Sequence, residues 1–362
     1  MNAGIYIHVP FCAVKCPYCD FYSGRYSAKE AADYKNAVCR NLSALPKGLI
    51  TDSVYFGGGT PSLLPPEMIE EIMDAAAARL SLSDDTEVTL ETNPLTVTEE
   101  RLAAWKQAGI NRLSIGVQSF SDETLRLLGR KHSAAQAVNA VLAAHSAGFQ
   151  NISADLMIGL RHQNSDALRK DLETAVSLPL VHISAYLLKI EPETPFGKDP
   201  PELLSSDETA DRYLEMHGFL TVSGFQHYEI SNFAKKGFAS RHNCKYWRGL
   251  PYYGIGPAAH SCHDGKRFAV PRDLKAFSAA TKQPESVTDE HALTDGERIM
   301  LGLRLREGIR PEDFPEVQNR LLKAASTLIP QYLSRENGRL AMTPQGWLVS
   351  NSVLAFLLRD IP

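Results

Sequence analysis

The chain has 362 residues, of which 22% are charged and 44% hydrophobic, and its formal net charge at pH 7 is −4. This length accommodates one barrel-sized domain and a smaller one, and the slight negative charge argues against a nucleic-acid partner. No apolar run is long enough for a transmembrane segment, and no secretory leader opens the chain, so we expect a cytoplasmic protein.

From residue 4 to about residue 222, short runs of β-forming residues alternate with runs of helical periodicity. This alternation predicts an α/β fold in which crossover helices join parallel strands. Six such units indicate either a partial (β/α)6 barrel or an open doubly wound sheet. The strands are predicted at Ile5–Val9, Ser53–Phe56, Glu87–Glu91, Arg112–Val117, Ile152–Met157 and His182–Leu187.

Several helix boundaries in this region also have sequence signals. Gly109 and Gly148 follow helical runs, where glycine commonly ends a helix. Capping boxes, in which the first and fourth residues bond each other's backbone, are predicted at Ser27 with Glu30, Thr96 with Glu99, and Ser133 with Gln136.

Beyond residue 222 the alternation ends, which predicts a barrel over 1–222, an extension over 223–285 and a C-terminal domain over 286–362. A polar stretch near 281–291 is predicted to be a linker, and Thr294 with Glu297 to open the next helix. Further helices are predicted near 316–333 and 350–359, around a hairpin of Arg339–Met342 and Gly346–Ser350. This mixture indicates a small winged-helix-like domain that serves packing or a protein partner.

Cys12, Cys16 and Cys19 follow the first predicted strand with the spacing C-x3-C-x2-C. Three thiolates cannot fill four coordination positions, so a [4Fe–4S] cluster held by them would keep one iron open to another ligand. A structural zinc site completed by His8 or a distant cysteine is an alternative, although no second cysteine pair is present. Three unrelated buried thiols are the other alternative.

Polar and glycine residues follow the predicted strands, where ligands bind in either architecture. A glycine loop, Gly57-Gly58-Gly59-Thr60-Pro61, follows the second strand, and it is either a tight turn or a place where backbone approaches a ligand. Further along the chain, Glu91 and Asp155 offer carboxylates, Gln118 an amide and Arg130 a guanidinium. This mixture of groups suits a ligand in which an amino acid is joined to a nucleoside. Each of the four could also be an ordinary residue at the rim of a barrel.

The cysteine spacing after a first strand, the GGGTP loop after a second and the six units together resemble the radical S-adenosylmethionine (SAM) superfamily. The resemblance implies a partial (β/α)6 barrel with a [4Fe–4S] cluster and SAM as cofactors. Within the superfamily, one branch contains oxygen-independent coproporphyrinogen III oxidase and the HemW heme chaperones. The segments that resemble this branch are Tyr6-Ile-His-Val-Pro-Phe-Cys12, Gly57-Gly-Gly-Thr-Pro61, Gly116-Val-Gln-Ser-Phe120 and Asp155-Leu-Met-Ile-Gly-Leu160.

The resemblance also implies site residues by motif position. Besides the three cysteines as cluster ligands, it implies cofactor contacts from Tyr6, Tyr18, Gly58, Gly59, Thr60 and Glu91. For a second SAM molecule, as in the oxidase, it implies Gln118, Arg130 and Asp155.

Two details separate the members of this branch. The oxidase carries a further cysteine two residues after the third, where this chain has Phe21. The segment His242-Asn-Cys-Lys-Tyr-Trp247 instead resembles the signature of heme chaperones, which makes His242 the candidate axial ligand of heme iron. Alternatively, His242 and Asn243 cap a turn, and Tyr246 and Trp247 are core residues. His260 is a second, weaker candidate for the ligand.

We therefore predict a heme chaperone that binds heme and passes it to acceptor proteins such as membrane-bound respiratory enzymes. This function would leave the chain cytoplasmic, with peripheral contact to the membrane. The alternatives are coproporphyrinogen III dehydrogenase, an enzyme of radical oxidative decarboxylation, and a zinc-bound structural protein. The sequence assigns no catalytic residue, and it leaves open the role of radical chemistry and whether the chain forms a homodimer.

Overall fold

The computed structural model describes residues 2–359 and 361, which build one curved sheet of twelve strands flanked by helices. The six central strands are parallel and adjacent in chain order, and together with their crossover helices they form the predicted partial barrel. Each predicted strand lies within one of them: β1 (Ala3–Val9), β4 (Ile50–Gly58), β5 (Ser81–Thr92), β6 (Arg112–Gln118), β7 (Asn151–Ile158) and β8 (His182–Leu187).

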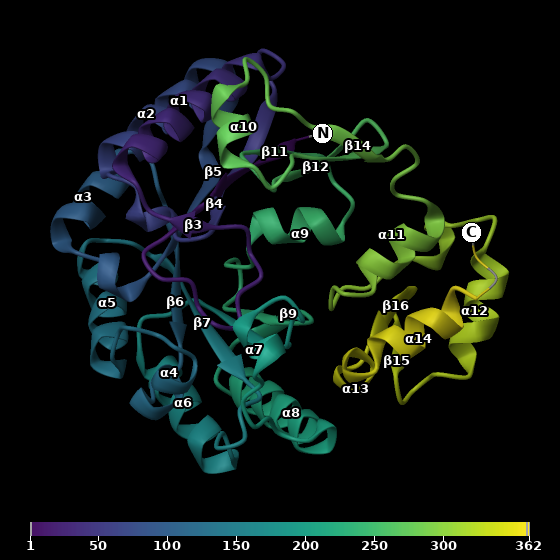
Figure 1. Cartoon of the computed structure of the whole chain (residues 1–362). Helices are drawn as coiled ribbons and strands as arrows, with labels where there is room; N and C mark the ends of the chain where they lie inside the picture. The colour runs from purple at the N-terminus through teal and green to yellow at the C-terminus, as the bar shows by residue number, and fades with distance from the viewer. Residues whose placement is uncertain (1, 360, 362) are drawn as a thin grey trace.

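The crossover helices lie along the outer, convex side of the sheet, as Figure 1 shows. They cover the apolar side chains of the strands, and every second residue of a strand faces them. A short helix, α9 (Arg241–Trp247), lies on the opposite, inner side. The outer helices are α1 (Ala28–Ala44), α2 (Pro66–Arg79), α3 (Glu99–Gln107), α4 (Asp122–Leu127), α5 (Ala134–Ser146), α6 (Ser165–Ser177) and α8 (Ser206–Val222).

The segment after residue 222 adds strands to both edges of this sheet. On one edge, β10 (Asn232–Ala234) and β9 (Gln226–Glu229) extend β8 in antiparallel fashion. On the other, β11 (Tyr252–Ile255) runs parallel to β1 and is followed by three antiparallel strands. These are β12 (His260–His263), β13 (Lys266–Ala269) and β14 (Ser286–Asp289).

Strand β14 lies inside the stretch predicted to be a linker, so that prediction is wrong for residues 286–289. The polar composition of this segment gives no strand signal in the sequence. The strand forms because it pairs with β13 through backbone hydrogen bonds and through an ion pair between Arg267 and Asp289 (Nη1–Oδ2 3.7 Å). Between β13 and β14, helix α10 (Leu274–Ala279) packs Phe277 against Tyr34 of α1, with ring centroids 5.9 Å apart.

The helix boundaries follow the predicted signals in part. The capping box of Ser133 and Gln136 is confirmed, and Gly109 and Gly148 adopt positive φ directly after α3 and α5. The box at Thr96 is wrong, because Pro94 starts a 3-10 turn there and Thr98 caps α3 instead. Ser27 precedes α1 but its side chain makes no capping hydrogen bond.

The C-terminal part consists of helices around a two-stranded hairpin. The strand at Arg339–Met342 is confirmed, but its partner is Leu333–Glu336 and not Gly346–Ser350. Thr343 and Pro344 begin a helix at that point, and the Thr343 hydroxyl accepts from the Gly346 amide at 3.0 Å. The elements are α11 (Asp295–Gly302), α12 (Gln318–Ser326), β15 (Leu333–Glu336), β16 (Arg339–Met342), α13 (Pro344–Leu348) and α14 (Ser350–Leu357).

Trp347 joins this C-terminal part to the barrel. Its indole donates to the Leu303 carbonyl at 3.2 Å, and its ring meets the edge of His227 on β9 with centroids 4.5 Å apart. His227 in turn stacks on Phe233 of β10, which is fully buried.

None of the helices in residues 2–359 and 361 combines the length and apolarity needed to cross a bilayer.

We predict that Trp347→Ala lowers the free energy of unfolding by about 3–5 kcal/mol, because it leaves a cavity and an unpaired carbonyl between the two parts. Phe356→Ala on α14 is the control, since that side chain is 42% exposed, and its cost should stay below about 1 kcal/mol. Urea unfolding measures both values. Equal losses in the two variants would contradict the role assigned to Trp347.

Candidate functional site

The inner face of the sheet is polar, in contrast to its outer face. On β1, Ile5, Ile7 and Val9 are fully buried toward the outer helices, so the alternate residues Tyr6 and His8 point inward. The same alternation along the other central strands brings a set of hydroxyls, carboxylates, one imidazole and one guanidinium into the interior. These residues are Ser53, Tyr55, Glu87, Glu91, Arg112, Ser114, Asp155, His182 and Ser184.

The three predicted cluster ligands lie on the loop that follows β1, at the carboxyl end of the parallel strands. The short strands β2 (Phe11–Cys12) and β3 (Gly24–Arg25) pair at the base of this loop. Two thiols accept hydrogen bonds from the barrel: Cys12 from the Thr60 hydroxyl at 3.6 Å and Cys16 from Arg130 Nη1 at 3.3 Å. Donors of this kind stabilise thiolates, the form that binds iron.

The arrangement of possible ligand side chains does not favour a structural zinc site at the cysteine loop. No group of three His, Cys, Asp or Glu side chains within residues 2–359 and 361 converges on a point where one ion could be held. His8, the suggested fourth ligand, uses both ring nitrogens, since Nε2 donates to the Tyr22 carbonyl at 2.9 Å and Nδ1 accepts from the Tyr6 hydroxyl at 3.1 Å. In a [4Fe–4S] cube each cysteine binds a different iron, so convergence on one point is not required.

The glycine loop at the end of β4 packs against the backbone that leads into the cysteine loop. The Gly59 amide donates to the Val9 carbonyl at 2.8 Å, and the Thr60 amide donates to the Phe11 carbonyl at 2.7 Å. A Cβ on Gly59 would lie 2.6 Å from the Phe11 oxygen, and a Cβ on Gly58, where φ is +108°, would meet the His8 ring at 2.6 Å. The close approach that these glycines permit is therefore to β1 and β2.

Glu91 lies inside the barrel directly below this loop. Its carboxylate accepts from the Tyr55 hydroxyl at 2.8 Å and from the Gly58 amide at 3.2 Å. Burial raises the pKa of Glu91 to about 7, and the neighbouring Asp155 also raises it, while these two hydrogen bonds oppose the rise. The group can therefore exist with or without its proton near neutral pH.

Asp155 on β7 is the second inner carboxylate. It accepts from the Ser114 hydroxyl at 3.2 Å, and burial raises its pKa to about 6 despite this bond and one from Ser184. Arg112, also on the inner face, is 1% exposed, and its Nε finds no hydrogen-bond partner in the part of the chain that the structure describes. The inner face therefore carries a buried guanidinium with an unpartnered nitrogen alongside the buried carboxyls of Glu91 and Asp155.

Arg130, Tyr18 and Gln118 lie at the rim of the barrel. Arg130 links Cys16 to the Gly116 carbonyl, to which its Nη2 donates at 2.7 Å. The Arg130 Nε is buried and has no hydrogen-bond partner within the described residues. Burial raises the pKa of Tyr18, and Gln118, the last residue of β6, adopts a φ of +70°. Such a backbone is uncommon outside glycine and is typical of functional positions.

His242 lies at the opposite end of the barrel interior from the cysteines, near the amino ends of β1 and β4. Its ring is buried, with Nδ1 hydrogen-bonded to Ser53 at 2.9 Å and Nε2 to Tyr246 at 2.9 Å. Burial lowers its pKa to about 3, and the charges of Lys245 and Arg112 lower it further. The imidazole is therefore neutral, but both of its nitrogens are engaged in this conformation.

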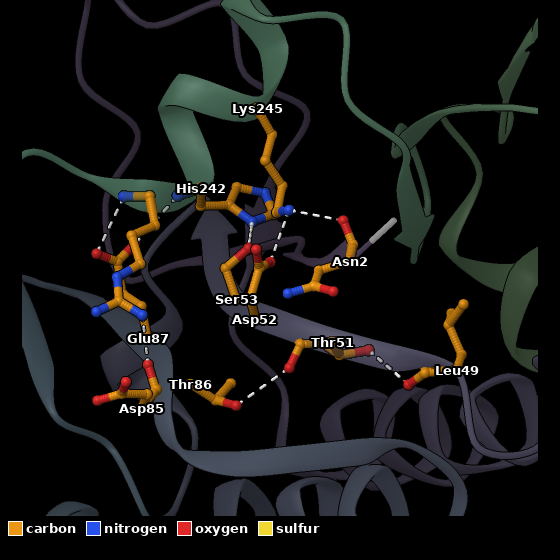
Figure 2. Close-up of polar contacts among 11 residues, drawn as sticks. Asn2, Leu49, Thr51, Asp52, Ser53, Asp85, Thr86, Glu87, His242 and Lys245 are labelled. Carbon is orange, nitrogen blue, oxygen red and sulfur yellow. Dashed lines mark hydrogen bonds and ion pairs between the residues drawn. The ribbon is translucent and has the colours of Figure 1, made fainter.

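Helix α9, which carries His242, is anchored by charged residues that the sequence analysis missed (Figure 2). The Glu87 carboxylate accepts from the amides of Arg241 and His242, each at 3.1 Å, and so caps the helix. Lys245 is buried and reaches Asp52 Oδ1 at 2.6 Å and the Asn2 carbonyl at 2.9 Å. Two features of the sequence could have indicated these anchors. They are Lys245, a lysine within the His242–Trp247 segment, and Glu87, a glutamate within a buried strand.

Tyr55 connects the two ends of the interior. Its ring stacks on His242 with centroids 5.1 Å apart, while its hydroxyl donates to Glu91. Tyr6 lies beside both rings, 6.1 Å from Tyr55 and 6.3 Å from His242. Trp247 points elsewhere and packs under the Arg304 guanidinium at 4.3 Å. The structure thus brings Tyr6, Glu91 and the glycine loop together with the cysteines, and His242 meets them only through Tyr55 and Tyr6.

Comparison with known proteins gives matches over nearly the whole chain. The family model of the radical SAM superfamily matches residues 6–175, and that of the HemN C-terminal domain matches residues 296–349. The heme chaperone HemW of Synechocystis sp. is 36% identical over 99% of this chain and 96% of its own length. HemW of Escherichia coli is 42% identical over 71% of this chain and 69% of its own length.

The fold resembles the solved structure of coproporphyrinogen III oxidase (HemN) from Escherichia coli. The TM-score is 0.82 at 20% sequence identity, over 98% of this chain and 90% of that one. At this identity the match establishes a shared fold, from the barrel through the C-terminal part.

We predict that Gly59→Ala reduces iron uptake during anaerobic reconstitution, because its Cβ would push Phe11 and Val9 away and displace the start of the cysteine loop. Gly24→Ala is the matched control, since a Cβ there meets nothing within 4 Å. Iron per chain and the cluster absorbance measure the effect. Full cluster content in Gly59→Ala would contradict this role of the glycine.

We also predict a pH dependence that Glu91 carries. Its folded pKa of about 7 exceeds the ordinary 4.5, so the folded state keeps a proton that the unfolded state loses between these values. The stability contributed by this group is therefore complete below pH 4.5 and is lost as the pH rises to about 7. For this shift the loss is on the order of 3 kcal/mol.

In Glu91→Gln this part of the fall in stability should disappear, while the smaller part due to Asp155 remains. Urea unfolding of the cluster-free chain over the same pH range compares the two proteins. Parallel stability curves for the wild type and the variant would refute the assignment.

Proposed function

Because this chain belongs to the HemW heme chaperone family of the radical SAM superfamily, we propose that it binds heme and delivers it to acceptor proteins. The observation that carries the proposal is the similarity to curated heme chaperones over nearly the whole chain. We further propose that the acceptors are membrane-bound respiratory enzymes, reached from the cytoplasm by peripheral contact.

Membership of the superfamily implies a [4Fe–4S] cluster and SAM, and the residues present suit both. Cys12, Cys16 and Cys19 would hold the cluster, which when bound supplies an open iron for the methionine part of SAM and an electron for its cleavage. The orphaned Nε of Arg130 and the strained backbone of Gln118 at the same rim are features of a site built for a ligand.

The residues on the inner face would orient the SAM molecule and place charges opposite its own charged groups. Glu91, once deprotonated, offers carboxylate oxygens to an ammonium group, and Tyr55 holds that carboxylate in place. Asp155, with Gln118 and Arg130, would serve a second SAM molecule, as in the oxidase. Tyr6, Tyr18 and Thr60 line the approach to the cysteine loop.

We propose His242 as an axial ligand of heme iron in the stable complex. Its neutral imidazole suits iron. Its present hydrogen bonds determine what must change before it can bind the iron. Either Ser53 or Tyr246 must release a ring nitrogen, and the ring must become accessible from its buried position. Movement of α9 away from β4 would achieve both.

The rival function is that of coproporphyrinogen III dehydrogenase. The residue at position 21 argues against it, since Phe21 stands where the oxidase carries a cysteine, and its side chain is exposed. Against the zinc-bound structural protein stands the finding that no three His, Cys, Asp or Glu side chains within residues 2–359 and 361 are grouped so that they could hold one metal ion.

Anaerobic reconstitution followed by titration with hemin tests the proposal. Stoichiometric heme binding without turnover of coproporphyrinogen III supports the chaperone. Turnover of that substrate would overturn it, and uptake of zinc without iron would overturn the cluster as well.

The role of His242 has its own test. We predict that His242→Ala loses stable heme binding, whereas Tyr246→Phe binds heme roughly fivefold tighter, since ligation no longer breaks that hydrogen bond. Tyr252→Phe is the control, because its ring touches Tyr246 but does not bond His242. Unchanged affinity in both His242→Ala and Tyr246→Phe would show that His242 is not the ligand.

A further inference from the structure

The motif Gly254-Ile-Gly-Pro-Ala-Ala-His260 is not used by the cofactor site described above, and it ends on a histidine at the start of β12, which lies between β11 and β13 in the sheet. Gly4 of β1 faces Ser53 and His242 on the inner side and pairs with Tyr252 of β11, which in turn lies opposite Cys262 of β12. Residues paired across strands point to the same face, and so do residues two apart in one strand. His260, two residues before Cys262, therefore belongs to the inner face.

Both glycines of this motif are required by packing. A Cβ on Gly254 would lie 2.1 Å from the His260 carbonyl oxygen, and a Cβ on Gly256 would lie 2.5 Å from the His8 carbonyl oxygen. The segment is therefore pressed against β1, the strand that leads into the cysteine loop. This packing constrains the backbone at His260.

The His260 ring is exposed and makes no hydrogen bond to any residue in 2–359 or 361. It differs in this respect from His8 and His242, whose ring nitrogens are all engaged. Burial of part of the ring lowers the pKa of His260, and Arg272 and Arg267 lower it further, so the imidazole is neutral at physiological pH. A free, neutral imidazole can bind ferric or ferrous heme without prior rearrangement.

Apolar and cationic groups accompany this histidine. The chain after Cys19 brings the Tyr22 carbonyl to His8 and the Asp20 carboxylate to Arg272, whose Nη2 lies 3.5 Å from Oδ2. Between them, the Phe21 side chain is 64% exposed. Arg272 is itself exposed and lies three residues beyond Ala269, which pairs with His260 across β12 and β13. Its charge lowers the pKa of both His8 and His260.

We propose that His260 is the first protein ligand that incoming heme iron meets, in an encounter site formed with Phe21 and Arg272. The porphyrin face would rest on the exposed Phe21 ring, and the Arg272 guanidinium would take a propionate carboxylate. The iron would bind the free imidazole before His242 becomes accessible. This inference rests on the proposed heme-binding function and adds the surface through which heme enters.

Rapid-scan absorbance after mixing the cluster-loaded protein with hemin tests the encounter site. The wild type should form an early species with the spectrum of imidazole-ligated heme. In His260→Ala this species should be absent and heme uptake slowed by about tenfold or more. In His242→Ala the early species should form and then fail to convert to the stable complex.

The matched control is His263→Ala, three residues along the same strand. That ring is held between Tyr253 and Phe268 and its Nδ1 pairs with Asp264, so its loss should not affect the early species. Arg272→Gln should slow uptake without changing the spectrum of the early species. Circular dichroism and cluster content check that each variant is folded and loaded.

The possible outcomes separate this inference from the proposed function. If the wild type takes up no heme at all, the chaperone proposal itself fails. If the wild type binds heme and His260→Ala forms the same early species at the same rate, the encounter site is refuted while the chaperone proposal stands. Equal slowing in His260→Ala and His263→Ala would also refute it, because the effect would not be specific to the free imidazole.

Discussion

The rest of the site depends on two backbone hydrogen bonds that fix the glycine loop against β1 and β2. They run from the Gly59 amide to the Val9 carbonyl and from the Thr60 amide to the Phe11 carbonyl. They tie the end of β4 to the start of the cysteine loop, so that Cys12 and the Thr60 hydroxyl come together. The same loop turns the Gly58 amide toward Glu91. Since only glycine fits against the Val9 and Phe11 carbonyls, loop, cysteines and carboxylate form one unit.

The inner face of the barrel is a buried polar network in which most groups are hydrogen-bonded, although Arg112 Nε and the Thr89 hydroxyl have no partner within the described residues. An unpaired buried polar group costs about 1–3 kcal/mol, so such a face is stable only when its hydrogen bonds are made. Tyr55 serves Glu91, Ser114 serves Asp155, and Ser153 bonds His182 at 2.7 Å. Burial raises the pKa of Glu91 to about 7, so its carboxyl is partly protonated near neutral pH, which reduces the remaining cost and makes the group responsive to a cationic ligand.

With His242 as the proposed heme ligand and Glu91 as the proposed SAM contact, this network would link heme binding to the cofactor end of the interior. His242 at one end stacks on Tyr55, and Tyr55 orients Glu91 beside the glycine loop at the other. Release of His242 from Ser53 and Tyr246 would free the face of Tyr55 and so alter the position of Glu91. Opening of α9 is opposed by the capping carboxylate of Glu87 and by the ion pair of Lys245 with Asp52.

Periodicity in the sequence was sufficient for the six parallel strands and their crossover helices, and the resemblance to the radical SAM superfamily selected the partial barrel over an open sheet. The six strands are long and buried on their outer side, and Cys12, Cys16 and Cys19 lie close together in the chain. Predictions failed where short polar segments were involved, as at β14, whose strand is held by its neighbour, and at Gly346–Ser350, where Thr343 and Pro344 start a helix. In both places tertiary pairing or a local cap outweighs weak propensity.

The sequence by itself determined which residues can bind a cluster, because ligand spacing within one loop is a local property. Only the tertiary structure decided the surroundings of each histidine. His242 and His260 are equally plain imidazoles in the sequence, yet one is enclosed by Ser53, Tyr55 and Tyr246 and the other is free. Burial and hydrogen bonding come from strands and helices distant in the chain, and those contacts exist only once the sheet has formed.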